Sequence, residues 1–198
     1  VLNTINIRLD AVTIAHILDD SNAKILLVDR ELFEVASESL SACSASPKVV
    51  VIEDEFADSR PEVSENIIKY ESLVSDGDPL FEWHRPYDEW QPLSLNYTSG
   101  TTGRPKGVVY HHRGSYLMSM GTVIGWELPN HPVYLYSVPM FHCNGWGHAW
   151  TMAAVAGTVV CLRAFSPEKV FNLLEKQSVT HFGGAPIMLN MLANAPKK

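Results

Sequence analysis

The chain has 198 residues, of which 46% are hydrophobic and 19% are charged, and this composition is ordinary for a globular domain that buries a sizeable core. Its formal net charge of −7 comes without a cluster of Lys and Arg. This disfavours nucleic acid as a partner, because a phosphate backbone binds to a concentrated basic surface.

The apolar stretches and the cysteines of the sequence indicate neither a membrane span nor a disulfide framework. The longest apolar stretch, residues 149–162, is interrupted by Gly157 and falls short of the roughly 20 residues that span a bilayer, so we expect no transmembrane segment. Cys43, Cys143 and Cys161 lack Cys-x-x-Cys spacing, which indicates free thiols in a reducing compartment. We expect an intracellular, cytoplasmic protein, with the peroxisome as the alternative in a eukaryote.

The first half of the chain alternates short apolar runs with amphipathic ones, which is typical of βα units around a largely parallel sheet. Asp10 is placed to cap a helix that runs to about residue 20. The helix is expected to carry these residues on or near one face: Val12, Ala15, His16 and Leu18. Buried strands are predicted at 24–29 and 48–53, and helices at 30–41 and 66–74. Residues 54–65 are acidic and irregular, and residues 75–92 indicate an ordered connector or lid-like loop.

The second half continues the alternation. Strands are predicted at 93–97, 108–110, 133–138, 158–162 and 179–182. Helices are predicted at 113–125 and 145–156, and two more are predicted to begin at Pro167 and at Pro186. Ser166 precedes Pro167 as a helix N-cap, so the spacing of Ser166 and Lys169 indicates capping and no Ser/Lys nucleophile. We therefore expect an α/β fold of layered βα units around largely parallel sheets.

The most informative segment is residues 97–108, YTSGTTGRPKGV, which combines hydroxyls, glycines and one lysine without an acidic residue. Gly100 and Gly103 let backbone N–H groups converge on phosphate oxygens, and Lys106 supplies a mobile positive charge suited to the outer phosphates of ATP. Further hydroxyl donors come from Thr98, Ser99, Thr101 and Thr102. The pattern predicts a phosphate-binding loop between two strands.

Other interpretations of this segment fit its sequence less well. The lysine precedes its glycine, which excludes a Walker loop, and a dinucleotide fingerprint needs a different glycine spacing before a helix. A Ser/Thr/Gly-rich surface linker remains the alternative. Such a linker has no need for a lysine behind Pro105 or for apolar strands on both sides.

The loop sequence resembles the signature of the AMP-dependent synthetases, the adenylate-forming superfamily of acyl-CoA ligases, peptide-synthetase adenylation domains and luciferases. Residues 138–146, VPMFHCNGW, resemble the Pro-x-Phe-His motif that follows it in that family. Residues 1–10, VLNTINIRLD, are similar to acyl-CoA ligases for short- or medium-chain acids. The resemblance covers essentially the whole chain. It implies that residues 1–198 are a fragment of the large N-terminal AMP-binding domain, without its later nucleotide motifs and without the mobile C-terminal domain.

The resemblance also implies the site. It assigns ATP binding to Thr98, Ser99, Gly100, Thr101, Thr102, Gly103 and Lys106, with Mg²⁺ at Thr102. Lys106 and His142 are the implied catalytic residues, with His142 near the acyl carboxylate and the α-phosphate. The implied acyl-binding residues are His142, Asn144, Gly145, Trp146, Gly184 and Ala185.

Each of these residues also has a structural interpretation. Without the family, His142 fits equally well as a buried histidine satisfied by the backbone. Trp146 and Trp150, four residues apart on one predicted helix face, fit core packing, and residues 183–186 fit a tight helix entry. His142, Cys143 and His148 could suggest zinc, which the lack of an acidic partner at ligand spacing disfavours. Residues 111–113 indicate a structural helix start.

The function implied for the whole enzyme is ATP-dependent activation of an apolar carboxylic acid through an acyl-adenylate, followed by transfer to CoA. Three alternatives stay open: an adenylation domain that loads a carrier protein, a luciferase-like oxidoreductase, and a non-catalytic nucleotide-binding module. The implied partners are therefore the acid, ATP and CoA.

Overall fold

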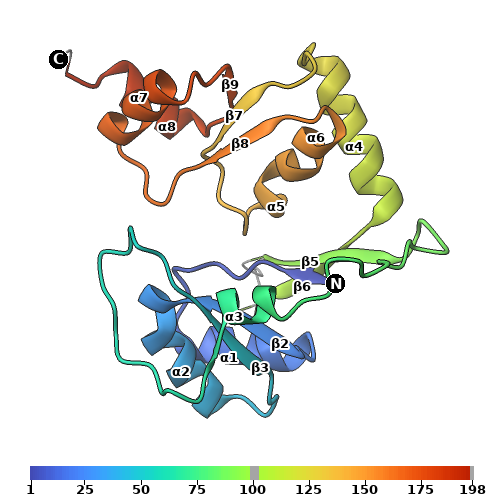
Figure 1. The fold of residues 1–198 in the computed structure, drawn as a ribbon, viewed down its shortest axis with the longest axis vertical. Helices are drawn as coiled ribbons and strands as arrows, with labels where there is room; N and C mark the ends of the chain where they lie inside the picture. The colour runs from blue at the N-terminus through green and yellow to red at the C-terminus, as the bar shows by residue number, and fades with distance from the viewer. Residues whose placement is uncertain (99–102, 197–198) are drawn as a thin grey trace. The chain divides into compact units, whose positions relative to one another are not determined.

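The computed structural model describes residues 1–98 and 103–196 (Figure 1). It divides into two compact units. The first unit comprises Val1–Thr4, Pro86–Asn96 and Val109–Lys198, and the second comprises Ile5–Arg85 and Tyr97–Val108. Each unit is described by itself.

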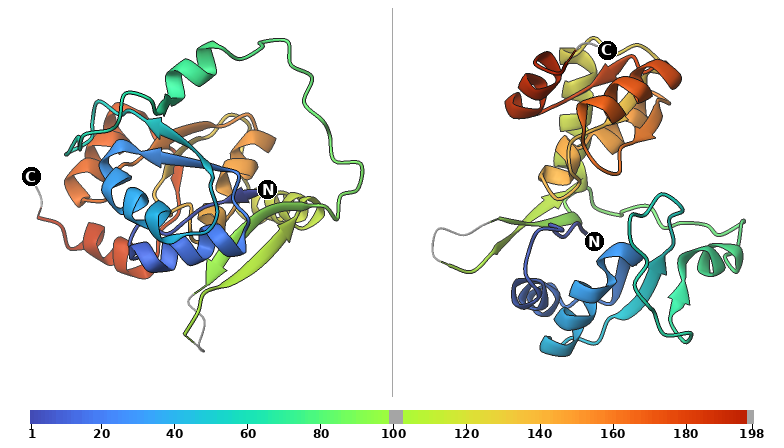
Figure 2. Two further views of the ribbon diagram at one scale, coloured as in Figure 1. Left: turned by 90° about the horizontal axis from the view of Figure 1, so that it is seen from below. Right: turned by 90° about the vertical axis from the view of Figure 1, so that its left-hand side faces the viewer.

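The second unit contains a parallel three-stranded sheet of β2 (Ile25–Asp29), β3 (Lys48–Ile52) and β4 (Ile68–Lys69). Ile25 pairs with Lys48, and Val50 pairs with Ile68. Helices α1 (Ala11–Asp20) and α2 (Phe33–Ala42) lie side by side against one face of the sheet (Figure 1, Figure 2). A short 3-10 helix, η1 (Arg30–Leu32), leads into α2, and α3 (Tyr70–Ser75) follows β4.

Helix α1 begins where its cap was predicted. The Asp10 carboxylate accepts a hydrogen bond from Thr13 N at 2.9 Å, which confirms the N-cap. The buried face of the helix consists of Ile14, Ala15, Ile17 and Leu18. The prediction for Val12 is wrong, because this side chain is 74% exposed. Two residues before Ile14, Val12 lies roughly 200° round the helix axis from it.

Two further predictions for this unit need correction. The strand at 24–29 buries one face only, since Ile25 and Leu27 are exposed while Val28 is buried. Neighbouring residues of a strand point to opposite faces, and the helices cover one of them. The predicted helix at 66–74 begins instead with β4 and becomes helical at Tyr70. A two-residue strand is too short to show an alternating pattern.

The first unit is built on a parallel sheet with β7 (Val133–Tyr136) in the centre, between β8 (Thr158–Cys161) and β9 (His181–Phe182). Helix α4 (His112–Gly125) packs against α6 (His148–Ala154), and α7 (Pro167–Lys176) and α8 (Pro186–Ala193) complete the unit (Figure 1). Its core contains Leu128, Tyr134, Met152 and Val155. The parallel βα architecture confirms the predicted α/β class.

A third sheet has the order β1 (Leu2–Asn3), β5 (Pro92–Thr98), β6 (Lys106–His111). Strands β5 and β6 flank the predicted phosphate loop, as the sequence indicated. β1 pairs with β5 in parallel.

The helix predicted over residues 145–156 is broken. Residues Cys143–Trp146 form the short α5, and the backbone is left-handed from Cys143 to Gly147, with φ between 48° and 65° at all five residues. A Cβ at Gly145 would lie 2.3 Å from Tyr136 Oη, and one at Gly147 would lie 1.9 Å from Met118 Cε. Trp146 and Trp150 therefore do not share one continuous helix face, contrary to the prediction.

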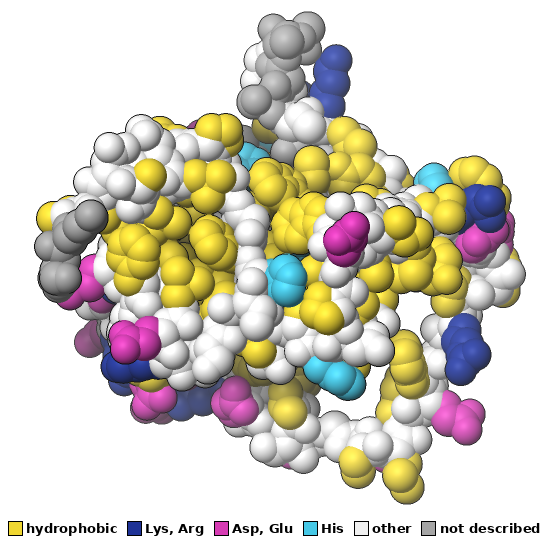
Figure 3. Space-filling model, turned by 90° about the horizontal axis from the view of Figure 1, so that it is seen from above, with side chains coloured by type: hydrophobic (Ala, Val, Ile, Leu, Met, Phe, Trp, Pro, Cys, Tyr) yellow, Lys and Arg dark blue, Asp and Glu magenta, His cyan; other side chains and the backbone are white. Residues whose placement is uncertain are grey.

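Apolar side chains are exposed over much of the chain. The segment 76–91 contains no helix or strand, and Leu80, Trp83 and Tyr87 in it are more than 80% exposed. On the face drawn in Figure 3, apolar side chains gather over broad areas while Lys and Arg are scattered. None of the helices in the described part of the chain is both long enough and apolar enough to cross a membrane.

Candidate functional site

The base of the predicted phosphate loop lies in the second unit. Thr98 ends β5, Lys106 begins β6, and Thr98 Oγ1 approaches the Lys106 carbonyl oxygen at 3.5 Å. Lys106 and Gly103 are exposed, and Gly103 has φ of 102°, a conformation that favours glycine. Residues 99–102 lie outside the described residues, so the roles predicted for Ser99, Gly100, Thr101 and Thr102 stay predictions.

Tyr97 fixes the strand that leads into this loop. Its hydroxyl donates to Asp20 Oδ2 at 2.7 Å, at the end of α1. Burial raises the pKa of the Tyr97 phenol, and the hydrogen bond and negative charge of Asp20 raise it further. The sequence offered no signal for Asp20, because 77 residues separate the two partners.

The start of helix α4 is structural, as predicted. His111 Nδ1 accepts from Gly114 N at 2.9 Å, while Arg113 N donates to the Glu89 carbonyl oxygen at 2.8 Å. The Arg113 guanidinium also pairs with the Glu89 carboxylate and lies over the Trp90 ring. The first-turn N–H groups therefore have partners within the first unit.

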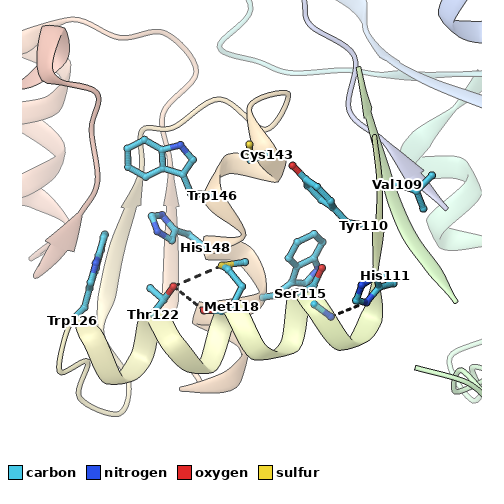
Figure 4. Close-up of a pocket in the computed structure, with 12 residues that line it drawn as sticks. Val109, Tyr110, His111, Ser115, Met118, Thr122, Trp126, Cys143, Trp146 and His148 are labelled. Carbon is cyan, nitrogen blue, oxygen red and sulfur yellow. Dashed lines mark hydrogen bonds between the residues drawn. The ribbon is translucent and has the colours of Figure 1, made fainter. Parts of the chain in front are cut away.

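The first unit contains a pocket of about 690 Å³ (Figure 4). It is lined by side chains from the end of β6, from one face of α4 and from the α5–α6 region, among them Tyr110, Met118, Trp126, Trp146, His148 and Trp150. The lining contains no Asp, Glu, Lys or Arg. It is therefore suited to an uncharged, largely apolar group.

Tyr110 and Cys143 face one another in this pocket (Figure 4). The hydrogen bond with the Cys143 thiol raises the pKa of Tyr110 to about 12, and burial adds to the effect. The contact joins β6 to the left-handed turn that starts at Cys143.

His148 and Tyr134 form a buried polar pair at the same pocket. His148 is 2% exposed, and its ring lies 5.0 Å from the Trp126 ring and 5.9 Å from the Trp146 ring, centroid to centroid. Its Nδ1 is hydrogen-bonded to Tyr134 Oη. Burial lowers the pKa of His148, so the imidazole is neutral at neutral pH. From the sequence, His148 stood out only as part of a disfavoured zinc site.

Asn144, predicted to bind the acyl group, lies in a buried polar network. Its Oδ1 accepts from Ser94 Oγ at 2.8 Å and from Asn96 Nδ2 at 2.7 Å, and its Nδ2 approaches Thr4 Oγ1 at 3.4 Å. Neither Asn144 nor its neighbour Gly145 lines the pocket. Gly145 packs against Tyr136.

The remaining predicted residues are spread over the first unit. His142 is exposed, with its ring 4.7 Å from that of Phe141, so the interpretation as a buried histidine is wrong. Gly184 and Ala185 precede α8 and are half-buried. Gly183, which is not among the predicted acyl-binding residues, is buried: a Cβ there would lie 3.3 Å from His148 Cε1 and 3.4 Å from Trp126 Cη2 and from Trp146 Cζ3. Of the predicted acyl-binding residues, Trp146 is the one that lines the pocket.

The described residues contain no group of three or more His, Cys, Asp or Glu side chains that could hold a metal ion. The predicted Mg²⁺ ligand, Thr102, lies outside them. The assignment of Mg²⁺ to Thr102 therefore stays a prediction.

Comparison with known proteins identifies the family. The model of the AMP-binding enzyme family matches residues 1–198. The chain is 42% identical to the peroxisomal acetate/butyrate–CoA ligase AAE7 of Arabidopsis thaliana, over 100% of this chain and 37% of that protein. It is 45% identical to the 2-methylpropanoate–CoA ligase CCL4 of Humulus lupulus, over 99% of this chain and 36% of that protein.

The fold is also that of solved structures. A putative long-chain-fatty-acid CoA ligase from Rhodopseudomonas palustris superimposes with a TM-score of 0.81 at 20% identity, over 98% of this chain and 46% of that one. The chain thus spans little more than a third of the length of the curated relatives it matches. It belongs to the AMP-binding enzyme family.

Proposed function

We propose that the protein carrying this chain activates a carboxylic acid with ATP, forms an acyl-adenylate and pyrophosphate, and passes the acyl group to the thiol of CoA. Two similar proteins, at 42% and 45% identity, are named as CoA ligases for acetate or butyrate and for 2-methylpropanoate. Residues 1–198 would form a fragment of the N-terminal AMP-binding domain of such an enzyme.

The pocket of the first unit carries the proposal for the acid. Its lining has aromatic and apolar side chains and no charged group other than its histidines, of which His148 is kept neutral by burial. A second carboxylate would lose its hydration there without a cationic partner, at a cost of several kcal/mol. The substrate is therefore a monocarboxylic acid with an apolar tail, of short to medium length.

The loop of the second unit supplies the chemistry at the phosphates. Lys106 stabilises the negative charge that develops on the α-phosphate and on the departing pyrophosphate, together with N–H groups of the loop. Thr102 is the proposed Mg²⁺ ligand, and the ion when bound would offset charge on the triphosphate. His142, exposed at the end of the strand–loop segment 133–142, is proposed to contact the acyl carboxylate.

The test uses the full-length protein with Mg-ATP, CoA and a panel of acids: propionate, butyrate, hexanoate, benzoate and succinate. We expect acid-dependent pyrophosphate exchange and AMP release, with acyl-CoA as product and succinate as the poorest acid. Preference for succinate would contradict the proposed acyl pocket.

Other outcomes identify the alternatives. Adenylate formation without acyl-CoA would indicate an adenylation domain that loads a carrier protein, and light emission or oxidation of the adenylate would indicate a luciferase-like oxidoreductase. Binding of ATP without any exchange would indicate a non-catalytic module.

We also propose an intracellular location, in the cytoplasm or in the peroxisome. The Arabidopsis relative is named as peroxisomal, which supports the second compartment without excluding the first. Imaging of the full-length protein with peroxisomal and cytosolic markers distinguishes the two.

A further inference from the structure

The hydrogen bonds of Tyr134 determine which nitrogen of His148 carries the proton. Tyr134 is fully buried, so its hydroxyl hydrogen needs an acceptor within the protein. Tyr134 Oη is hydrogen-bonded to His148 Nδ1. Within the described residues, Nδ1 is the one acceptor that the structure gives to the Tyr134 hydroxyl hydrogen. Nδ1 is therefore the acceptor, and Nε2 carries the hydrogen of the neutral ring.

His148 is one of the residues that line the pocket. The structure gives its Nε2 no hydrogen bond within residues 1–98 and 103–196. Among the same residues, the buried side-chain polar atom without a partner is Asn3 Oδ1, so His148 Nε2 retains access to the pocket space. Figure 4 shows the His148 ring near the side chains of Trp126 and Trp146.

We propose that His148 is a specificity-determining residue whose Nε2–H donates a hydrogen bond to a neutral acceptor oxygen on the acyl chain of the acid. The class of acid is one with a keto or ether oxygen within or at the end of an otherwise apolar chain. This inference rests on the function proposed above.

The donor makes selection depend on chain length. An acid too short to reach His148 leaves the N–H to water, which satisfies it at no cost. A longer hydrocarbon chain displaces that water and leaves a buried donor without a partner, which is unfavourable. A carbonyl oxygen at the matching position restores the hydrogen bond. Short plain acids and longer oxo acids are therefore both accepted, whereas longer plain acids are disfavoured.

The experiment measures kcat/KM of the full-length enzyme for plain acids of two to eight carbons and for oxo acids of the same lengths, with the carbonyl at successive positions. For wild-type enzyme, we expect at one position a preference of about tenfold for the oxo acid over the plain acid of equal length. In His148→Phe, which keeps an aromatic ring and removes the donor, we expect kcat/KM for the plain acid to rise and the preference for the oxo acid to disappear. The matched control is His84→Phe on the exposed segment 76–91, which keeps the wild-type preference.

Tyr134→Phe tests the positioning role of the phenol. Without the phenol, Nδ1 of His148 can carry the proton and Nε2 can accept a hydrogen bond. Because a hydroxy acid can donate one, we expect its kcat/KM to rise relative to that of the oxo acid of equal length. A purely structural role for Tyr134 would lower kcat/KM for both classes equally.

The outcomes separate this inference from the function on which it rests. Equal kcat/KM for oxo and plain acids at every position in the wild-type enzyme overturns the role of His148. A preference that persists in His148→Phe overturns it as well. If no acid, short ones included, releases AMP, the proposed function fails and the inference fails with it.

Discussion

Lys106 can be tested at the level of a single residue. Its side chain is exposed at the start of β6, so its removal leaves the packing of the second unit unchanged. Lys106→Ala is expected to lower the rate of adenylation at least roughly tenfold, about 1.4 kcal/mol of transition-state stabilisation. The neighbouring cation gives the control, since Arg104→Ala also removes an exposed positive charge. Equal pyrophosphate exchange in both variants would refute a specific phosphate contact by Lys106.

Asn144 contributes to stability through its buried amide. Asn144→Ala removes the acceptor of Ser94 Oγ and Asn96 Nδ2 and places alanine at φ of 51°, so we expect a loss of about 3 kcal/mol in the free energy of unfolding. Asn22 has φ of 48° but is exposed. Asn22→Ala is therefore expected to cost only about 1 kcal/mol, from the strain and from one exposed hydrogen bond that Asn22 Oδ1 accepts from Lys24. Urea denaturation measures both, and equal losses would show that the buried network adds nothing.

At the scale of elements, local signals could be predicted from the sequence and tertiary ones could not. The caps at Asp10 and Ser166 depend on side chains three residues from their partners, and both are present. The left-handed turn at 143–147 depends on Tyr136 and Met118, which approach its glycines from β7 and α4. A sequence pattern shows the two glycines but not these neighbours, so the turn was taken for part of one helix.

Two glycines of the first unit differ in the space around them, and we expect alanine to change the free energy of unfolding in opposite directions at the two positions. At Gly145 the added Cβ would meet the Tyr136 ring at 2.3 to 2.7 Å, with φ of 60°, so Gly145→Ala is expected to lower the free energy of unfolding by more than about 2 kcal/mol. At Gly121, within α4, a Cβ meets no atom within 4 Å. Gly121→Ala should raise stability by about 0.5 to 1 kcal/mol, because alanine favours the helix. A loss of stability at Gly121, or none at Gly145, in thermal unfolding would contradict this.

At the scale of the whole molecule, the sequence identified the family and the α/β class but not the composition of the pocket. Tyr134 lies in β7, His148 in α6 and Gly183 directly after β9, and no spacing in the sequence joins them. The predicted phosphate loop is the reverse case, since the residues assigned to it form one contiguous segment of the sequence. A local motif can be predicted from the sequence, whereas the composition of a pocket depends on which side chains the fold brings together.

The exposed apolar surface leads to a prediction for residues 1–198 expressed alone. Side chains such as Leu80, Trp83, Tyr87 and Ile187 are at least 70% exposed, and surfaces of this kind mark contacts with further structure. The chain spans 37% of the length of its Arabidopsis relative, and we expect the rest of such an enzyme to cover these faces and to supply the adenine and ribose contacts. Each missing hydrogen bond is worth on the order of 1 kcal/mol, so the segment alone should fold, bind a hydrophobic dye and bind Mg-ATP orders of magnitude more weakly than the full-length protein. Isothermal titration with Mg-ATP and an assay for AMP release measure this, and a micromolar Kd or steady AMP production by the segment would show that its nucleotide site is already complete.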